Sequence, residues 1–148
     1  MRIHNKVTLV ELLEEVAIIG VLVAISVPIF TAQLEKSRDA VTLANLRAAY
    51  AEAQTAYLTK GSAADAATGE VTTNGDHTVT VKKATTGYTV EVTKVASKGQ
   101  KEGLDNSDQL PFNASGLTGV ASMGGTAKDW IVTFTYDADG KITKVEAK

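Results

Sequence analysis

The side chains that could do chemistry in this sequence are few, and most of them are carboxylates. Two short acidic stretches, Asp105-Asn106-Ser107-Asp108 and Asp137-Ala138-Asp139-Gly140, contain oxygen ligands of the kind that Ca²⁺ prefers. Neither matches the twelve-residue calcium loop, and turns also favour Asp and Asn. We therefore expect turns and no metal at either stretch. If calcium does bind, its candidate ligands are Asp105, Asp108, Asp137 and Asp139.

The remaining residue types predict neither an enzyme nor a cofactor. His4 and His77 have no partner at the spacing of a catalytic triad or a metal site, so we expect solvated surface side chains. Cysteine is absent, which excludes disulfides, thiolate metal sites and a cysteine nucleophile. The net charge of −2, without a basic stripe of interleaved aromatics, gives no reason to expect nucleic acid as a partner.

Three further carboxylates, Glu11, Glu14 and Glu15, lie in or beside a long apolar run. The run reads VTLVELLEEVAIIGVLVAISVPIF from Val7 to Phe30 and has no charge after Glu15. A membrane-spanning helix needs about 20 mostly apolar residues, which Val16 to Leu34 supplies. Glu14 and Glu15 then mark the cytoplasmic boundary, and the basic start of the chain places the N-terminus inside.

Two other interpretations of this run fit poorly. A cleaved secretory signal needs a small-x-small site, whereas Pro28-Ile29-Phe30 stands where cleavage would fall. A buried core helix of a soluble protein would be shorter and less uniformly apolar. Within the run, Pro28 predicts a kink, and Gly20 would let helices approach closely in lipid.

Three segments of this run carry a family resemblance. Val7-Thr8-Leu9-Val10-Glu11-Leu12-Leu13, Ala17-Ile18-Ile19-Gly20-Val21-Leu22 and Pro28-Ile29-Phe30 resemble the N-terminal signature of type IV pilins and of the related type II secretion pseudopilins. The resemblance covers about the first quarter of the chain, and the spacing from Glu11 to Gly20 to Pro28 is that of the family.

The resemblance implies a processing and assembly route. A prepilin peptidase would remove residues 1–6 by cutting between Lys6 and Val7, and would methylate Val7. Glu11 would neutralise the terminal amine of a neighbouring subunit. The implied partners are other copies of the chain in a helical homopolymer, the membrane, the peptidase, and the assembly platform with its ATPase machinery.

The chain departs from the family pattern at four positions. Lys6 stands where the family has glycine, and Val7 where it most often has phenylalanine. Glu14 and Glu15 replace apolar residues. We expect Lys6 to obstruct cleavage, and we expect two unpaired carboxylates to disfavour assembly near neutral pH, since burying an unpaired charge is costly.

The helix is predicted to continue to about Lys60. An apolar stripe recurs at spacings of three and four: Leu43, Leu46, Tyr50, Ala53 and Tyr57. We expect this stripe to pack on a sheet. The charged residues of the same stretch should face solvent: Glu35, Lys36, Arg38, Asp39, Arg47 and Glu52. Lys60-Gly61 then supplies a cation and a glycine typical of a helix end.

The C-terminal half predicts an antiparallel sheet of about four strands, so the fold is α+β and pilin-like. The strands are expected at 78–83, 88–95, 130–136 and 141–146, with a bulge or strand end near Ile142 and Val145. Residues 61–76 should form a loop, and 97–125 a long connection pinned by Leu110, Phe112 and Leu117. Without cysteine, packing, hydrogen bonds or a metal must hold this connection.

The expected organisation is a leader at 1–6, a transmembrane and assembly helix at 7–34, and a globular head at 35–148. The resemblance implies a structural subunit of a type IV pilus (fimbrium). The subunit would be a single-pass protein of the cytoplasmic membrane before assembly, with its N-terminus in the cytoplasm, and part of an extracellular filament afterwards. Two alternatives stay open: a pseudopilin of a secretion or DNA-uptake machine, and a membrane-anchored binding module that never polymerises.

Overall fold

A computed structural model of the chain describes residues 8–101, 103–112, 117–118, 123, 125 and 127–148. The chain divides into two compact units, Met1–Leu34 and Glu35–Lys148.

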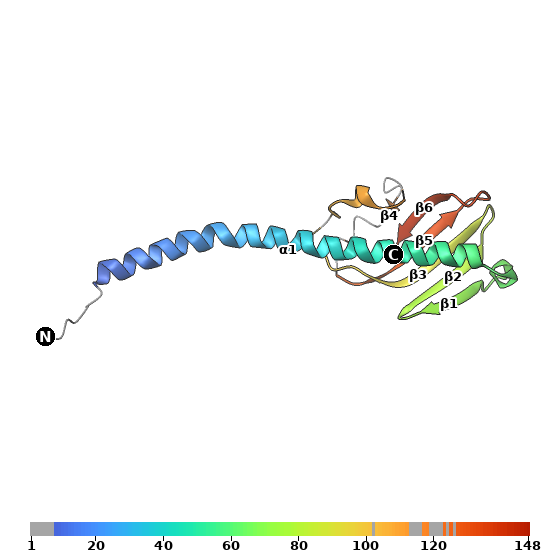
Figure 1. The fold of residues 1–148 in the computed structure, drawn as a ribbon, viewed down its shortest axis with the longest axis horizontal. Coiled ribbons are helices and arrows are strands. Elements are labelled where there is room, and N and C mark those ends of the chain that lie inside the picture. The colour runs from blue at the N-terminus through green and yellow to red at the C-terminus, as the bar shows by residue number, and fades with distance from the viewer. Residues whose placement is uncertain (1–7, 102, 113–116, 119–122, 124, 126) are drawn as a thin grey trace. The chain divides into compact units, whose positions relative to one another are not determined.

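One long helix, α1, runs from Leu9 to Thr59 (Figure 1). Its first part belongs to the N-terminal unit and buries none of its large apolar side chains. The helix ends where the sequence predicts: the ammonium of Lys60 donates a hydrogen bond to the carbonyl oxygen of Tyr57 at 3.0 Å. A cation there satisfies a carbonyl that the helix itself leaves free.

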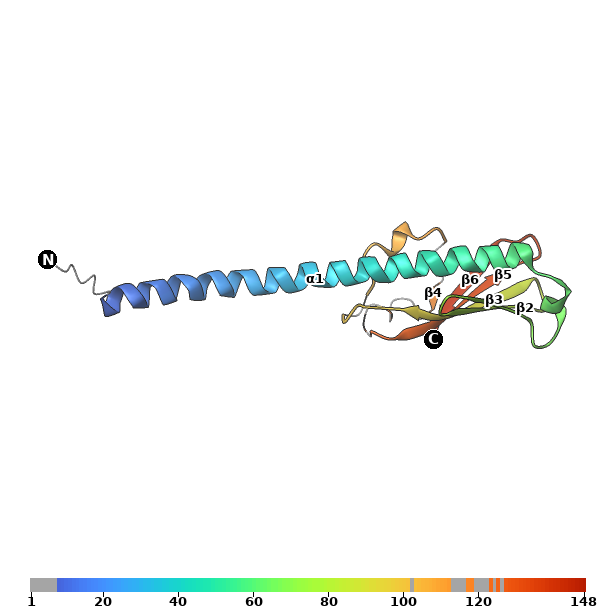
Figure 2. The same ribbon diagram turned by 60° about the horizontal axis from the view of Figure 1, so that its bottom comes forward.

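The second unit contains a six-stranded sheet in the order β1-β2-β3-β5-β6-β4 (Figures 1 and 2). Its strands are β1 (Glu70–Asn74), β2 (His77–Lys83), β3 (Tyr88–Ala96), β4 (Leu117–Thr118), β5 (Asp129–Tyr136) and β6 (Ile142–Ala147). All neighbouring strands pair antiparallel except β4, which pairs parallel to β6. The predicted α+β class with a helix on an antiparallel sheet is confirmed.

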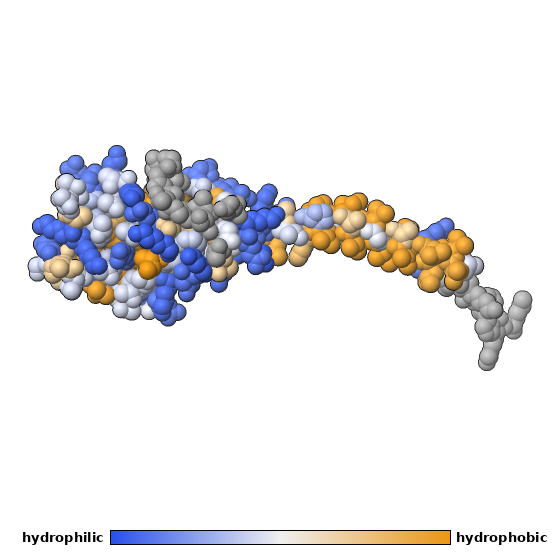
Figure 3. Space-filling model, turned by 180° about the vertical axis from the view of Figure 1, so that it is seen from behind, coloured by the Kyte–Doolittle hydropathy of each residue, from blue (hydrophilic) through white to orange (hydrophobic). Residues whose placement is uncertain are grey.

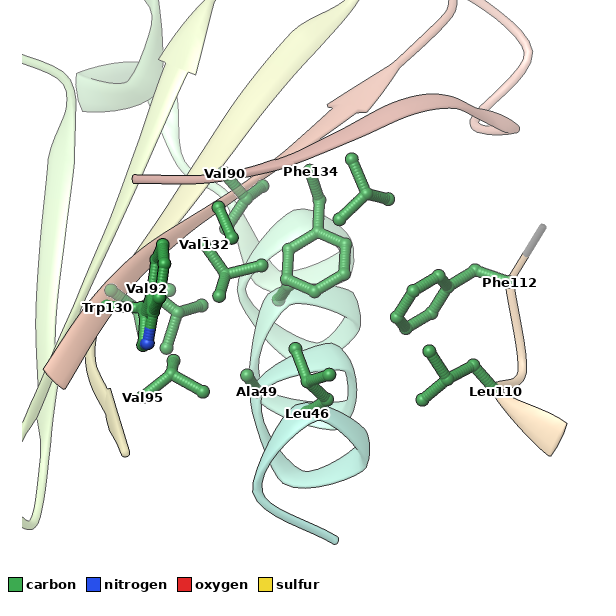
Figure 4. Packing of buried hydrophobic residues seen from close by; sticks show 14 of the residues in the cluster. Leu46, Ala49, Val90, Val92, Val95, Leu110, Phe112, Trp130, Val132 and Phe134 are labelled. Carbon is green, nitrogen blue, oxygen red and sulfur yellow. The ribbon is translucent and has the colours of Figure 1, made fainter. Parts of the chain in front are cut away.

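The core lies between the sheet and the part of α1 that belongs to the second unit (Figure 4). Leu46, Ala49 and Ala53 of α1 are fully buried. The strands contribute alternate residues, among them Val90, Val92, Val132, Phe134 and Tyr136, all at 0% exposure. The predicted helical stripe and the predicted strand alternation are both confirmed, because each periodicity places its apolar members on the shared face.

Two predictions about the sheet are wrong in detail. The stretch expected as a loop contains β1, which pairs with β2 from Glu70–Val81 to Asn74–His77, so the sheet has more than four strands. Apart from its first residue, β1 is exposed along its length. It therefore shows no apolar alternation that could reveal it in the sequence. The long connection also contributes the two-residue strand β4.

The irregularity expected near Ile142 is confirmed. The register of β5 against β6 shifts where Thr135 pairs with Lys144 but Tyr136 pairs with Ile142. A second shift lies between Val92 and Val95 on β3. Each shift inserts extra residues on one strand and bends it.

The turn between β2 and β3 requires a glycine. Gly87 has φ +90°, and a Cβ there would collide with the carbonyl of Tyr136. The neighbouring hairpin between β1 and β2 also has a glycine at positive φ, but Gly75 has open space around it. A side chain is therefore disfavoured at Gly87 by both backbone conformation and collision, but at Gly75 by backbone conformation alone.

Candidate functional site

The first feature with functional meaning is the bare apolar surface of the N-terminal part of α1. Every large apolar side chain from Leu9 to Phe30 is between 50% and 77% exposed. Figure 3 shows this surface as an almost continuous apolar band with a hydrophilic patch at its N-terminal end. α1 is long and apolar enough to cross a membrane. A surface of this kind marks a membrane or protein interaction site.

Glu11 closes the N-terminal end of α1 through a capping box with Thr8. The Glu11 Oε2 atom accepts hydrogen bonds from the Thr8 backbone N–H at 2.7 Å and from its hydroxyl at 2.9 Å. The Glu11 N–H donates in return to Thr8 Oγ1 at 3.3 Å. The Thr-x-x-Glu spacing before an apolar run is the signal for this cap, and the sequence interpretation above missed it. Glu11 therefore has a local structural role beside the assembly role that the resemblance implies.

The structure shows less about the other residues of the family pattern than about Glu11. Gly20 has no atom within 4 Å of the place where a Cβ would stand, so it leaves an open notch on the helix. Pro28 lies inside α1, and the kink expected there stays a prediction. Lys6, Val7 and His4 lie outside the described residues.

Within the second unit, a polar face of α1 holds the chain that follows β3. The face consists of Glu35, Asp39, Thr42 and Asn45, and we call it the loop clamp. Glu35 and Asp39 were expected in solvent, but they are only 9% and 4% exposed. Both carboxylates accept backbone N–H groups of the connection, so their burial has a clear physical reason.

The clamp makes one hydrogen bond after another along the connection. Glu35 Oε1 accepts the N–H groups of Gln100 at 2.5 Å and Lys101 at 2.8 Å. Asp39 Oδ2 accepts the N–H of Asp105 at 3.2 Å.

The other two members of the clamp, Thr42 and Asn45, form hydrogen bonds with the backbone at the start of the connection. Thr42 Oγ1 accepts the N–H of Lys98 at 3.0 Å, and the Asn45 amide donates to the carbonyl of Ala96 at 2.7 Å. Steps of three and four residues place these four side chains on one side of the helix.

The two carboxylates of the clamp differ in their electrostatics. The N–H of Gln100, with help from that of Lys101 and from the guanidinium of Arg38, lowers the pKa of Glu35. Burial raises the pKa of Asp39, and the nearby charges of Glu35 and Asp105 raise it further. Among the described residues, Asp39 Oδ1 is buried and has no hydrogen-bond partner. The charged form of Asp39 is therefore less favourable in the folded protein than that of Glu35.

Aromatic packing holds the middle of the connection, around Phe112. The Phe112 ring lies 5.5 Å from the rings of both Tyr50 and Phe134 (centroid to centroid), and Leu110 is buried beside them (Figure 4). The predicted pinning by Leu110 and Phe112 is confirmed, whereas the side chain of Leu117 lies outside the described residues. Packing and hydrogen bonds thus hold the described part of the connection up to Phe112, in a chain that has no cysteine.

The calcium candidates do not form a cluster. Asp137 Oδ1 accepts the N–H groups of Asp139 at 3.0 Å and Lys141 at 2.8 Å, which is turn chemistry. Asp105 and Asp108 belong to the connection, away from this turn in the sequence. Across the described part of the chain, no group of three or more Asp, Glu, His or Cys side chains could hold a metal.

The expectation of a solvated histidine is wrong for His77. Its Nδ1 lies 2.8 Å from Glu52 Oε2, and both side chains are less than a quarter exposed. Asn74 Nδ2 also donates to Glu52 Oε1 at 3.3 Å. The pair joins the start of β2 to α1, and the residues are too far apart in the sequence for spacing to reveal it.

Comparison with known proteins adds no relative. The sequence matches no family model, and no curated protein or solved structure matches it either. The arrangement of one long apolar helix and an antiparallel sheet is that of a pilin-like fold.

Proposed function

We propose that this chain is a structural subunit of a type IV pilus-like filament. The membrane would hold it through residues 7–34 before assembly, and the same helix would pack against other copies afterwards. The observation that carries the proposal is the bare apolar surface of α1 from Leu9 to Phe30, in a chain whose residues 35–148 have a packed core of their own.

The physical reason is the amount of apolar surface that the fold leaves uncovered. Burying a Val, Leu, Ile or Phe side chain stabilises it by about 1.5–3 kcal/mol. The N-terminal part of α1 carries more than a dozen such side chains in the exposed state. Lipid can cover this surface in the single subunit, and neighbouring helices can cover it in a polymer, which accounts for both stages of the proposed function.

The head supports the second stage because it does not depend on the apolar part of α1. Its core residues all come from Leu43 onwards, and the loop clamp begins at Glu35. A head that folds on residues 35–148 can keep its structure while the environment of the preceding helix changes from lipid to protein.

The test is to express the full chain in a bacterium that has a prepilin peptidase and an assembly platform. Electron microscopy of shear fractions gives filament yield, and mass spectrometry of the intact protein shows cleavage before Val7. The variant Lys6→Gly is the matched partner, since it restores the small residue of the family pattern. We expect Lys6→Gly to be cleaved more completely and to give filaments.

Three outcomes separate the proposal from its alternatives. Long filaments that contain the chain support it. A cleaved Lys6→Gly protein that stays monomeric by crosslinking in membranes would contradict it and favour the non-polymerising binding module. Short fibres confined to the cell envelope, together with a loss of secretion or DNA uptake on deletion, would favour the pseudopilin role.

A further inference from the structure

Strand β1 leaves one edge of the sheet open. It is the first strand in the order of the sheet, and β2 is its only strand neighbour among the described residues (Figure 1). Such an edge is a template for pairing with another extended chain, and sheets often protect it with a lysine, a proline or a bulge. β1 contains neither lysine nor proline, and it pairs with β2 without a register shift. The edge is therefore able to accept a further strand.

Two residues of β1 direct their backbone hydrogen-bonding groups to the open side. Asn74 and His77 flank a two-residue hairpin loop, so they form a hydrogen-bonded pair, and bonded and unbonded pairs alternate along antiparallel strands. The unbonded residues of β1 are therefore Thr73 and Val71. In agreement, the N–H of Thr78, opposite Thr73, donates to a side chain of β3. In the described part of the chain, no hydrogen bond reaches the outer N–H and C=O groups of Val71 and Thr73.

A groove of about 380 Å³ lies beside this edge, between β1 and α1. Its volume is within the range of sites that bind small ligands. Ala51 and Ala56 of α1 and Val79 of β2 are among the residues that line it, together with threonines of both elements. Glu52 is the only ionisable residue in this described lining. The groove therefore combines apolar surface with a single negative charge.

Glu52 can accept a further hydrogen bond from a cation. Its two carboxylate oxygens lie 3.0 and 2.8 Å from His77 Nδ1, and one of them accepts the Asn74 amide at 3.3 Å. A carboxylate has about four acceptor positions, and these contacts fill at most three. The Glu52 side chain is 18% exposed, so a ligand can reach it. The complementary ligand group is a cation on an apolar stem, which describes a lysine side chain.

A strand added to β1 would bring such a side chain to the groove. Thr72 pairs with the buried Val79, so both lie on the face of the sheet that packs on α1. In an antiparallel addition, the residue opposite Thr72 lies on the same face. Asn74, which contacts Glu52, is a diagonal neighbour of that added residue, and long side chains reach their diagonal neighbours.

We infer that β1 binds an extended segment of a partner protein, antiparallel, with a lysine opposite Thr72 that pairs with Glu52. Backbone hydrogen bonds to Val71 and Thr73 hold the segment, and the groove selects its side chain, as in other cases of strand addition. The carboxylate favours a cation over an acidic side chain, and the apolar lining favours the methylene stem. All of these residues belong to Glu35–Lys148, so the inference goes beyond the proposed function and does not depend on it.

Titration of ¹⁵N-labelled full-length chain in a non-ionic detergent with a synthetic peptide tests the site. The probe is acetyl-Ser-Thr-Val-Lys-Val-Thr-Ser-amide, which has one lysine in a strand-forming sequence. We expect saturable binding and slower hydrogen exchange of the Val71 and Thr73 amides, with a smaller change at Thr72, whose N–H is already bonded to β2. A peptide with norleucine in place of lysine keeps the stem without the charge and should bind at least about fivefold more weakly.

A conservative variant assigns the charge selectivity to Glu52. Glu52→Gln keeps an acceptor for His77 and Asn74 but removes the negative charge. It should weaken binding of the lysine peptide at least about fivefold and leave the norleucine peptide within about twofold of the parent. The matched control is Glu91→Gln, which changes the net charge equally on a residue of β3 between two buried neighbours, hence on the opposite face of the sheet. It should bind both peptides as the parent does.

N-methylated peptides test strand pairing without changing the protein. Methyl groups on the N–H of both valines should abolish binding, because these groups face β1, whereas a methyl group on the lysine N–H should be tolerated, because it points away.

Several results would overturn the inference. They are absence of saturable binding, equal affinity for the lysine and norleucine peptides, equal weakening by Glu52→Gln and Glu91→Gln, or the same effect of both methylation patterns. Protection of Val71 and Thr73 that grows with protein concentration in the absence of peptide would assign the edge to a second copy of the chain instead. Filament yield is measured separately, so these results leave the proposed function untouched.

Discussion

The loop clamp gives a sharp prediction through Thr42, whose side chain is 0% exposed. Its hydroxyl accepts the N–H of Lys98 at 3.0 Å and donates to the carbonyl of Arg38 at 3.1 Å. The substitution Thr42→Val keeps the branched shape and the volume, so the packing of α1 is preserved. It leaves the Lys98 N–H without its acceptor.

The magnitude follows from which group loses its partner. The Arg38 carbonyl still accepts the backbone N–H of residue 42 within the helix, so its loss is small. The bond between Lys98 and Thr42 is only partly buried, so we expect Thr42→Val to lower the free energy of unfolding by about 0.5–1.5 kcal/mol, the net contribution of a typical hydrogen bond. The matched control is Thr55→Val, whose hydroxyl makes the same bond to the carbonyl four residues earlier, at 2.9 Å, but is exposed. The control should stay within about 0.5 kcal/mol of the parent.

The assay is urea unfolding of the full chain in a non-ionic detergent, followed by tryptophan fluorescence. Trp130 is the only tryptophan, and its indole N–H donates to Ser97 Oγ at 2.8 Å, beside the perturbed amide. Hydrogen exchange of the Lys98 amide gives a local readout, which should become faster in Thr42→Val alone. Equal stabilities of the two valine variants, or unchanged exchange at Lys98, would refute the role assigned to Thr42.

The turns and the clamp carboxylates give three further predictions. Gly87→Ala should cost roughly 2–5 kcal/mol, because a collision adds to backbone strain, whereas Gly75→Ala should cost only about 1–2 kcal/mol; equal losses in urea unfolding would contradict this. Burial raises the pKa of Asp39, so its penalty grows as the pH rises above the ordinary carboxyl range; the stability of Asp39→Asn relative to the parent should therefore increase from about pH 3 to about pH 7, and a constant difference would refute it. A chain that begins at Gln33 should melt cooperatively and at a higher temperature than one that begins at Arg38, because only the former keeps Glu35 and its two backbone hydrogen bonds; identical melting curves would disprove the contribution of Glu35.

Periodicity predicted those buried faces whose apolar residues recur at a regular spacing within a single helix or strand. The stripe from Leu43 to Tyr57 and the alternation from Trp130 to Tyr136 each place apolar residues on one face, and both faces are buried. The irregularity near Ile142 could also be predicted, because the apolar residues there depart from the two-residue alternation of a strand.

Features decided by a distant segment could not be predicted in this way. Glu35 and Asp39 look like solvated helix residues until the backbone N–H groups of Gln100, Lys101 and Asp105 are placed on them. The same holds for Glu52, whose partner His77 is 25 residues away. The capping box of Thr8 and Glu11 is different: it is local, and its spacing was available in the sequence.

The order of strands in the sheet has a consequence for how the head is made. β1, β2 and β3 are neighbours both along the chain and in space, so they can pair as soon as they exist. β5 joins β3 only after the connection from Ser97 to Lys128 has closed, and β4, which precedes β5 in the chain, has β6 as its partner. Closing a long loop delays pairing, because its entropy must be lost before the contacts form.

During synthesis, the helix and the first three strands therefore exist before the sheet can be completed. In that interval the inner edge of β3 has free backbone groups, and such an edge is a template for pairing with another chain. In the proposed function, a subunit anchored in a membrane among copies at the same stage would be exposed to this hazard for as long as the connection takes to close. The hydrogen bonds from the clamp to Ala96, Lys98 and Gln100 hold the start of the connection against α1 and so shorten the part that must still search for its place.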